Sequence, residues 1–308
     1  MKKIAVIGSN SFSGSSFINL LLNKNVKVIG LSRSYELKYY FSRYRKNKKI
    51  DNFFFQKLDI NKNQRKIIDT LDYFKPEIII NYSAQSMVGE SWANPLDWYN
   101  TNVNSTISLI ENLKKKKYIK KFIQFSTPEV YGSTKNYIKE NTPFNPSTPY
   151  AVSRATSDYH LNLIFKEFNF PSIITRAANV YGEYQDLYRI IPLSIIKILK
   201  KEKLFLHGGG KTQRSFIHID DVNNALLKII RTGKLGETYH IATNEKISIY
   251  KLVEKICNQM NFNIKDLIIN SDERVGKDKN YFLNSDKLRS ELKWNDDVPL
   301  DMGIKKVI

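Results

Sequence analysis

The sequence predicts an α/β protein built on a doubly wound parallel sheet, with a smaller lobe in its C-terminal part. Three observations lead to this expectation. Short apolar runs alternate with helical patterns as far as about Asn179, a turn bounded by Gly8 and Gly14 follows the first run, and the alternation weakens beyond Asn179. A chain of 308 residues suits one α/β domain with an appended lobe.

The alternation starts near the first residue. Residues 3–8 have the pattern of a buried strand, 13–23 that of a helix, and 26–32 that of a second strand. Further strands are predicted at 53–58, 77–82, 122–126 and 172–176, and helices at 101–114 and 150–168. Because strands that alternate with helices are joined by crossovers, the sheet is expected to be parallel.

Composition argues against several classes of protein. The formal net charge is +19 and the isoelectric point is near 9.6. These values also occur in nucleic-acid binders, but lysine is spread along the whole chain, so we interpret the charge as a composition bias and expect no nucleic-acid partner. No apolar run is long enough to span a membrane, and the first apolar run is too short for a signal peptide. Cys257 is the single cysteine, which excludes an internal disulfide and fits a reducing cytoplasm.

The four histidines lack the spacing of metal ligands, so no metal site is expected. His218 stands close to Asp220 and Asp221, which resembles a proton relay. Two carboxylates in front of Val222 are, however, typical of the first turn of a helix, and we predict a helix start there.

The turn between the first strand and the first helix has the composition of a phosphate-binding loop. It covers residues 8–14, with the sequence GSNSFSG. Amides at a helix N-terminus lack intrahelical partners and lie at the positive end of the helix dipole, so they suit a pyrophosphate. Gly8 permits the tight turn, Gly14 lets helix and strand pack closely, and Ser11 replaces the glycine usual between them. The turn is therefore expected to hold a dinucleotide through Gly8, Ser11, Phe12 and Gly14.

The end of the second strand indicates which dinucleotide binds. An acidic residue there would bind the adenosine ribose of NAD, but the sequence has Ser32 and Arg33. A hydroxyl next to a guanidinium suits a 2′-phosphate, so NADP is expected, with NAD as the alternative. Residues after the third and fourth strands are assigned to the same cofactor: Asp59, Ile60, Ser83 and Ala84.

The expected domain organisation follows from these assignments. The Rossmann-type cofactor domain comprises residues 1–178, with 215–243 returning to it. The smaller lobe comprises 179–214 and 244–308.

Two later segments carry a family resemblance. Residues 125–132 read FSTPEVYG, and residues 149–154 read PYAVSR. They resemble the extended short-chain dehydrogenase/reductase superfamily, and within it the nucleotide-sugar 4,6-dehydratases that act on dTDP-glucose or GDP-mannose. Five further motifs match in the expected order: AQS at 84–86, NVYG at 179–182, GGGKTQR at 208–214, RVGKD at 274–278 and SDKL at 285–288. The resemblance therefore covers nearly the whole chain.

The resemblance implies a catalytic role for Tyr150, Arg154 and Thr127. Tyr150 matches the base that takes the proton of the sugar C4 hydroxyl while hydride passes to the nicotinamide. A phenol needs a nearby cation to act as a base near neutral pH. The family places a lysine four residues later, which also holds the nicotinamide ribose, but here that position is Arg154, whose fork differs in size and shape from an ammonium. Thr127 matches the residue that hydrogen-bonds the C4 hydroxyl.

Glu129 separates the reactions known on this scaffold. The dehydratases of the family carry glutamate here as the base that removes the C5 proton once C4 is a ketone, whereas 4-epimerases need no such base. The preceding residue often supplies the acid for the leaving hydroxyl, and Pro128 has no proton to give. We therefore expect an NADP-dependent nucleotide-diphosphate-hexose 4,6-dehydratase. A 4-epimerase or other oxidoreductase is the alternative, and a non-catalytic nucleotide-binding protein is a third reading, because Ser11, Pro128 and Arg154 all depart from the family pattern.

On the substrate side, Asn179 and Arg214 match positions that bind the substrate diphosphate, and Arg274 matches a further anion-binding arginine. Guanidinium and amide donors suit a diphosphate. Three more residues are assigned to the substrate: Gln85, Ser86 and Arg189.

The expected partners are a nucleotide sugar and a second copy of the chain. Residues 84–86 favour the GDP-mannose branch and the lobe motifs favour the dTDP-glucose branch, so the base and the hexose stay open. The helices at 101–114 and 150–168 match those that pair across a two-fold axis in family homodimers, so a homodimer is expected.

Overall fold

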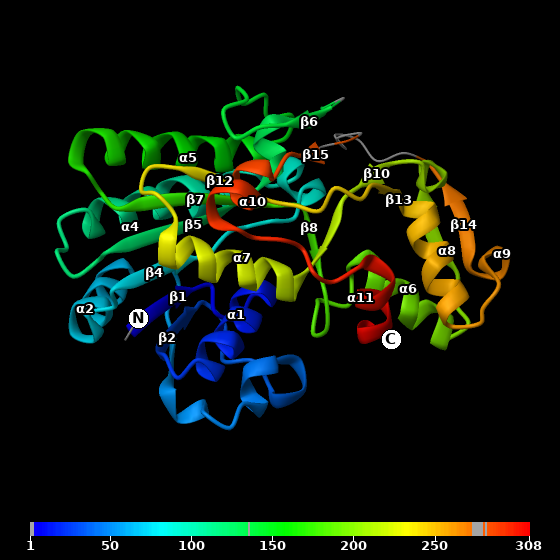
Figure 1. The fold of residues 1–308 in the computed structure, drawn as a ribbon, viewed down its shortest axis with the longest axis horizontal. Coiled ribbons are helices and arrows are strands. Elements are labelled where there is room, and N and C mark those ends of the chain that lie inside the picture. Colours follow the sequence, from blue (N-terminus) through cyan, green and yellow to red (C-terminus); the bar gives the residue numbers. More distant parts are fainter. Residues whose placement is uncertain (1–2, 135, 273–279, 281) are drawn as a thin grey trace.

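A seven-stranded parallel sheet forms the centre of the molecule (Figure 1). The computed structural model describes residues 3–134, 136–272, 280 and 282–308. The strand order is β12-β7-β5-β4-β1-β2-β3. The strands are β1 (Lys3–Ile7), β2 (Lys27–Ser32), β3 (Phe53–Lys57), β4 (Ile78–Asn81), β5 (Lys121–Ser126), β7 (Ser172–Ala177) and β12 (Thr238–Ile241). This arrangement confirms the predicted fold class. The order reverses between β1 and β4, which is where open α/β sheets bind ligands.

Helices cover both faces of the sheet (Figure 1). On one face, α1 (Phe12–Asn23) and α7 (Ile219–Thr232) share a core with the sheet, with Phe17, Ile18 and Leu226 among its fully buried members. On the other face, α2 (Gln64–Phe74), α4 (Thr106–Leu113) and α5 (Pro149–Phe168) bury a second core. The two cores explain why the strands read as continuous apolar runs rather than as alternating ones.

The helix predicted at 101–114 is longer and less regular than expected. It begins with α3 (Pro95–Trp98), passes through a π-helical segment η5 (Tyr99–Ser105) and continues as α4. The extra residue per turn in a π segment rotates the helix, and Asn102 in this segment is fully buried. Helix α2 was not among the predicted helices, although Asn63 precedes it and Pro76 follows it.

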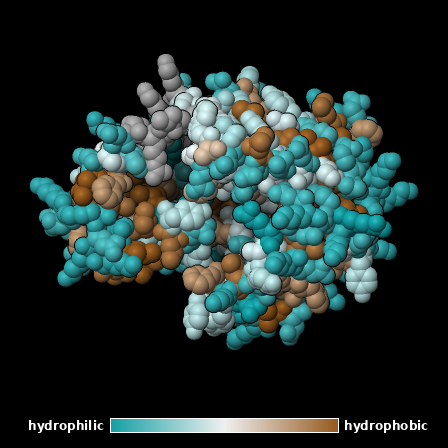
Figure 2. Space-filling view, turned by 180° about the vertical axis from the view of Figure 1, so that it is seen from behind, coloured by the Kyte–Doolittle hydropathy of each residue, from teal (hydrophilic) through white to brown (hydrophobic). Residues whose placement is uncertain are grey.

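A third core fills the smaller lobe, which lies beyond the carboxyl ends of the main strands (Figure 1). Its helices are α6 (Ile190–Leu199), α8 (Ile249–Gln259), α9 (Ile264–Leu267) and α11 (Leu300–Val307). Its short strand pairs are β8 (Asn179–Tyr181) with β11 (Phe216–His218), β9 (Leu204–His207) with β14 (Ile268–Ser271), and β10 (Gln213–Arg214) with β13 (Ile247–Ser248). From behind, apolar side chains gather over this lobe, whereas much of the remaining face is hydrophilic (Figure 2).

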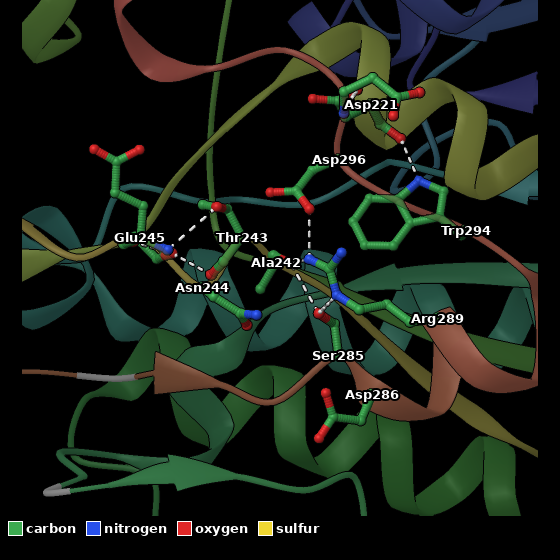
Figure 3. A network of polar contacts seen from close by, with 12 residues as sticks. Asp221, Ala242, Thr243, Asn244, Glu245, Ser285, Asp286, Arg289, Trp294 and Asp296 are labelled. Atoms are coloured by element: carbon green, nitrogen blue, oxygen red, sulfur yellow. Dashed lines mark hydrogen bonds and ion pairs between the residues drawn. The ribbon is translucent and has the colours of Figure 1, made fainter.

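The segment after the lobe returns to the main sheet. Its helix α10 (Asp286–Leu292) packs on α7 and β12, and β15 (Phe282–Leu283) pairs with β6 (Tyr137–Ile138). Arg289 donates to the carbonyl of Ala242 at 3.1 Å and to Asp296 at 2.5 Å (Figure 3). Trp294 donates to the carbonyl of Asp221 on α7 at 3.1 Å. The predicted domain boundaries stay a prediction. Within 244–308, the core that α1 and α7 share with the sheet includes Leu283, Leu288, Leu292 and Trp294.

The helix start predicted at Asp220 and Asp221 is confirmed, since both lie in the first turn of α7. The cap, however, is the His218 ring, whose Nδ1 accepts from the Asp220 amide at 3.3 Å. Within the described residues, no helix is long and apolar enough to cross a membrane.

Candidate active site

The phosphate turn closes tightly against the end of β4. Gly8 has φ +80°, and a Cβ on it would lie 2.8 Å from the backbone nitrogen of Ser83. The hydroxyl of Ser11 donates to the Gly8 carbonyl at 2.7 Å and accepts from the Gly14 amide at 3.1 Å. The Ser11 side chain therefore folds back into the turn and caps α1, and we expect the amides of the turn to stay available for a pyrophosphate.

We expect the Gly8→Ala variant to lose stability and cofactor affinity. Alanine would have to hold a left-handed conformation and push Ser83 away, which costs on the order of 1–3 kcal/mol. Denaturant unfolding and cofactor titration measure the two losses. Gly89→Ala is the matched control, because a Cβ at Gly89 meets no atom within 4 Å. Equal stability of the two variants would contradict the role given to Gly8.

The segment after β2 is tied to the phosphate turn. Ser32 is half-buried, whereas Arg33 is exposed. The Asn10 amide donates to the Ser34 hydroxyl and to the Tyr35 carbonyl, both at 2.8 Å. Lys57, the register partner of Ser32 on β3, lies 3.6 Å from the centre of the Tyr35 ring. Neither Asn10 nor Lys57 was among the predicted cofactor residues. The signals that could have indicated them are the asparagine within the phosphate turn and the lysine at the end of the third strand.

The other cofactor positions lie at the carboxyl ends of β3 and β4. The Asp59 carboxylate accepts from the Asn61 amide at 2.8 Å, and Ile60 is buried. Ser83 donates from its hydroxyl to Asn81 at 2.5 Å, and Ala84 is half-buried. These residues therefore follow the strand ends along which the predicted dinucleotide would run.

The catalytic residues predicted from the resemblance come together at the carboxyl end of β5. Thr127 caps the 3₁₀ turn η6 (Pro128–Tyr131) by accepting from the Glu129 amide at 3.3 Å. Burial raises the pKa of the Tyr150 phenol, and the charge of Glu129 raises it further. The charge of Arg154 and a hydrogen bond with the Thr127 hydroxyl lower the same pKa. Thr127, Glu129 and Arg154 therefore lie close enough to influence the same phenol, and their catalytic roles stay a prediction.

Arg154 is buried one helical turn beyond Tyr150, with 1 % of its surface exposed. Its Nη2 donates to the Phe125 carbonyl at 2.5 Å. Its Nε and Nη1 make no hydrogen bond within the described part of the chain. Buried guanidinium nitrogens normally find partners, so these two donors fit a group supplied by a ligand, such as the ribose hydroxyls of a nicotinamide nucleotide.

Gln85 is held by the π segment. Asn102 accepts from the Gln85 amide at 2.9 Å, and its side-chain nitrogen donates to the Gln85 carbonyl at 3.0 Å and to Ser153 of α5 at 2.9 Å. Asn102 thereby joins the loop after β4 to the helix that carries Tyr150, although it was not among the predicted site residues. Ser86, the next predicted substrate residue, is exposed.

Two of the predicted substrate residues are adjacent at the start of the lobe. Asn179 donates from its backbone and its side chain to the Ser215 carbonyl, at 3.0 and 3.2 Å, and Arg214 precedes that serine. Arg189 is exposed before α6, and its charge lowers the pKa of Tyr150. Arg274 lies outside the described residues. Across the described residues, no group of three or more His, Cys, Asp or Glu side chains could hold a metal ion.

The strand order, the phosphate turn and the residues around Tyr150 define an enzyme of the extended short-chain dehydrogenase/reductase class. The chain belongs to the GDP-mannose 4,6 dehydratase family, whose sequence model matches residues 6–307. It is 29% identical to a probable dTDP-glucose 4,6-dehydratase of Sinorhizobium fredii, over 99% of this chain and 91% of that protein. It is 32% identical to dTDP-D-glucose 4,6-dehydratase of Bos taurus, over 76% of this chain and 67% of that protein. The resemblance read from the motifs is confirmed.

Solved structures agree with this class. The dTDP-glucose 4,6-dehydratase of Bacillus anthracis, in complex with NAD, superposes with a TM-score of 0.88 at 29% identity, covering 100% of this chain and 95% of that one. UDP-glucose 4-epimerase of Thermotoga maritima superposes with a TM-score of 0.89 at 24% identity, covering 99% and 97%. The second likeness shows a shared fold only. The protein is therefore a nucleotide-sugar 4,6-dehydratase by class.

Proposed function

We propose that the protein converts a nucleotide-diphosphate hexose into its 4-keto-6-deoxy derivative with loss of water, using NADP. The Gly8 turn and the two open donors of Arg154 fit a nicotinamide dinucleotide. When bound, that cofactor would accept hydride from C4 and return it at C6. The substrate diphosphate would lie against Asn179 and Arg214, with Arg189 and Arg274 as further cations and Gln85 and Ser86 facing the sugar.

Tyr150 and Glu129 together can accept and return every proton that moves in the proposed reaction. Tyr150, as phenolate, takes the C4 hydroxyl proton while Thr127 holds the C4 oxygen. Glu129 then removes the C5 proton, which the new ketone has made acidic. Pro128 offers no proton to the leaving C6 hydroxyl, so we assign this role to Tyr150, which carries the proton taken from C4. Water leaves, and Glu129 gives its proton back to C5 as the hydride reaches C6.

The observation that carries this proposal is the place of Glu129. It follows Thr127 by two residues in η6, and its charge acts on the Tyr150 phenol. A carboxylate beside the base that forms the ketone is what an elimination needs and a C4 epimerisation does not.

Product identification tests the proposal. The protein is incubated with dTDP-, GDP- and UDP-hexoses, and the products are separated by mass. A product lighter than its substrate by one water, with a ketone at C4 and a methyl group at C6, is the expected result. A C4 epimer as sole product would favour the epimerase alternative, for which Pro128 is the supporting observation. Cofactor binding with no turnover of any sugar nucleotide would favour the non-catalytic alternative.

We expect the Arg33→Ala variant to lose affinity for NADPH by about 10- to 100-fold and to bind NADH almost unchanged, because the guanidinium would pair only with the 2′-phosphate. Fluorescence titration with both nucleotides measures the difference. Arg65→Ala, which removes an exposed arginine from α2, is the control. Equal losses for both nucleotides would leave NAD as the cofactor, as in the solved dTDP-glucose 4,6-dehydratase structures, which hold NAD.

We also propose that the protein acts as a homodimer in the cytoplasm. The outer side of α5 exposes Val152, Tyr159 and Leu163, which stand in one stripe along the helix, and α3 exposes Leu96. Apolar side chains gathered on neighbouring helices suit a self-complementary interface.

A further inference from the structure

A buried group of charges lies beneath the catalytic residues, between α5 and the sheet. Arg154 and Asp158 stand one helical turn apart on α5 and are 1 % and 0 % exposed. They are anchored to adjacent residues of β5: Arg154 to the Phe125 carbonyl at 2.5 Å, and Asp158 to the Ser126 hydroxyl at 2.7 Å. The two side chains therefore point to the same part of the sheet.

Despite this arrangement, Arg154 and Asp158 do not pair. Opposite charges four residues apart on a helix normally attract each other. Here Asp158 Oδ2 is bound by Nη2 of Arg176, a residue of β7, at 2.8 Å. Asp158 Oδ1 and the Nε and Nη1 atoms of Arg154 make no hydrogen bond within the described residues. A buried acceptor and two buried donors are thus left open on successive turns of one helix.

Arg176 also reaches the turn that carries Glu129. Its Nη1 donates to the Tyr131 hydroxyl at 2.6 Å, and its guanidinium lies 5.0 Å from the centre of the Tyr131 ring. Tyr131 is the last residue of η6, two residues after Glu129. A single arginine on β7 therefore contacts both the helix that carries Tyr150 and the turn that carries Glu129.

We propose that Arg176 is a positioning residue of the dehydratase: it holds Asp158 so that the guanidinium of Arg154 stays free to serve Tyr150, and it holds Tyr131 so that η6 keeps its place. This inference rests on the proposed function, because it assumes that Tyr150 is the base of the C4 oxidation. Arg176 and Asp158 would then influence the charge around Tyr150 without touching the substrate.

Charged side chains from three segments influence the pKa of the Tyr150 phenol: Arg154 on α5, Glu129 on η6 and Arg189 before α6.

The surroundings of Arg176 include the His240 ring on β12. Burial lowers the pKa of this ring to about 3, so His240 stays neutral in the working range.

Two further groups lie close to Arg176. Burial raises the pKa of Glu140, which accepts from the His240 amide at 3.0 Å, and Lys287 of α10 adds a cation nearby. Asp158 is the anion on the inner side of α5 that could neutralise Arg154. Whether it does so depends on its ion pair with Arg176.

The test is a pair of substitutions with opposite predicted signs. The C4 oxidation is followed in single turnover as formation of reduced cofactor, against pH, in the Asp158→Asn and Arg176→Gln variants. Asp158→Asn removes the anion next to Arg154, which favours the phenolate, so the acid limb of the rate should move to lower pH by about half a unit to one unit. Arg176→Gln frees Asp158 to pair with Arg154, so the limb should move to higher pH by a similar amount.

Further measurements separate this role from a structural one. The double variant should return the limb close to the wild-type pH, and circular dichroism reports whether each variant is folded. If Arg176→Gln does not fold, the Asp158→Asn arm decides alone. Lys197→Gln and Glu202→Gln, which break an exposed ion pair of 2.6 Å, are charge-matched controls.

Shifts in the same direction, or slower rates with an unmoved limb, would overturn the inference. A wild-type protein that reduces no cofactor with any sugar nucleotide would instead overturn the proposed function.

Discussion

Replacing Tyr150 with phenylalanine is expected to slow C4 oxidation, with a fall in kcat of about 10²- to 10⁴-fold, the usual contribution of a positioned general base. Burial raises the pKa of this phenol, and Arg154 and Thr127 oppose that effect. The reaction rate should therefore rise with pH in the wild-type protein, because the phenolate is the active form and low pH protonates it.

The measurement is the appearance of reduced cofactor at 340 nm and of product by mass. Tyr73→Phe is the matched control, since Tyr73 lies on α2 with 91% of its surface exposed. Nucleotide affinity should survive the Tyr150→Phe change. A variant that still oxidises its substrate at the wild-type rate would show that another group is the base.

The Glu129→Gln variant is expected to separate the two halves of the reaction. The amide keeps the size of the side chain but cannot take the C5 proton, so dehydration should fall by about 10²- to 10⁴-fold while C4 oxidation continues. Reduced cofactor should therefore accumulate. The exchange of the C5 hydrogen with deuterium from solvent, seen by mass, should be lost as well.

Glu167→Gln provides the control for this change, because Glu167 is an exposed glutamate near the end of α5. If Glu129→Gln left the rate of water loss unchanged, the elimination base would have to be another residue. If it left an epimerisation unchanged and no dehydration were found in the wild-type protein, the alternative function would hold.

Much of the fold could be predicted because most strands of the main sheet are buried on both faces, with the edge strand β3 as the exception. Runs such as 78–80 and 122–123 carry no charge and are bounded by polar residues, so their type and order could be read directly. Helix α2 was missed although its two buried residues, Ile67 and Leu71, stand at helical spacing between Asn63 and Pro76. Strand β12 was not predicted as a strand because its four residues, Thr238–Ile241, include a buried histidine.

The proposed catalytic residues Thr127, Glu129 and Tyr150 could be named from the sequence because each stands in a motif that specifies both its chemistry and its place along the backbone. The site could not be predicted where a contact joins distant segments. Asn102 reaches Gln85 only because a π segment rotates it inwards, and a single sequence carries no reliable signal for that irregularity. Arg176 looks like an ordinary residue at a strand end until the fold sets Asp158 beside it.

The position of β12 determines when the large sheet can be completed during synthesis of the chain. This strand forms one edge of the large sheet, beside β7, although some 60 residues of chain separate the two, among them α6 and α7. While the ribosome is still translating the lobe, the fully buried strand β7 presents a bare edge of unpaired amides and carbonyls. Nascent chains paused before residue 238 would be the ones that chaperones must shield from pairing with one another.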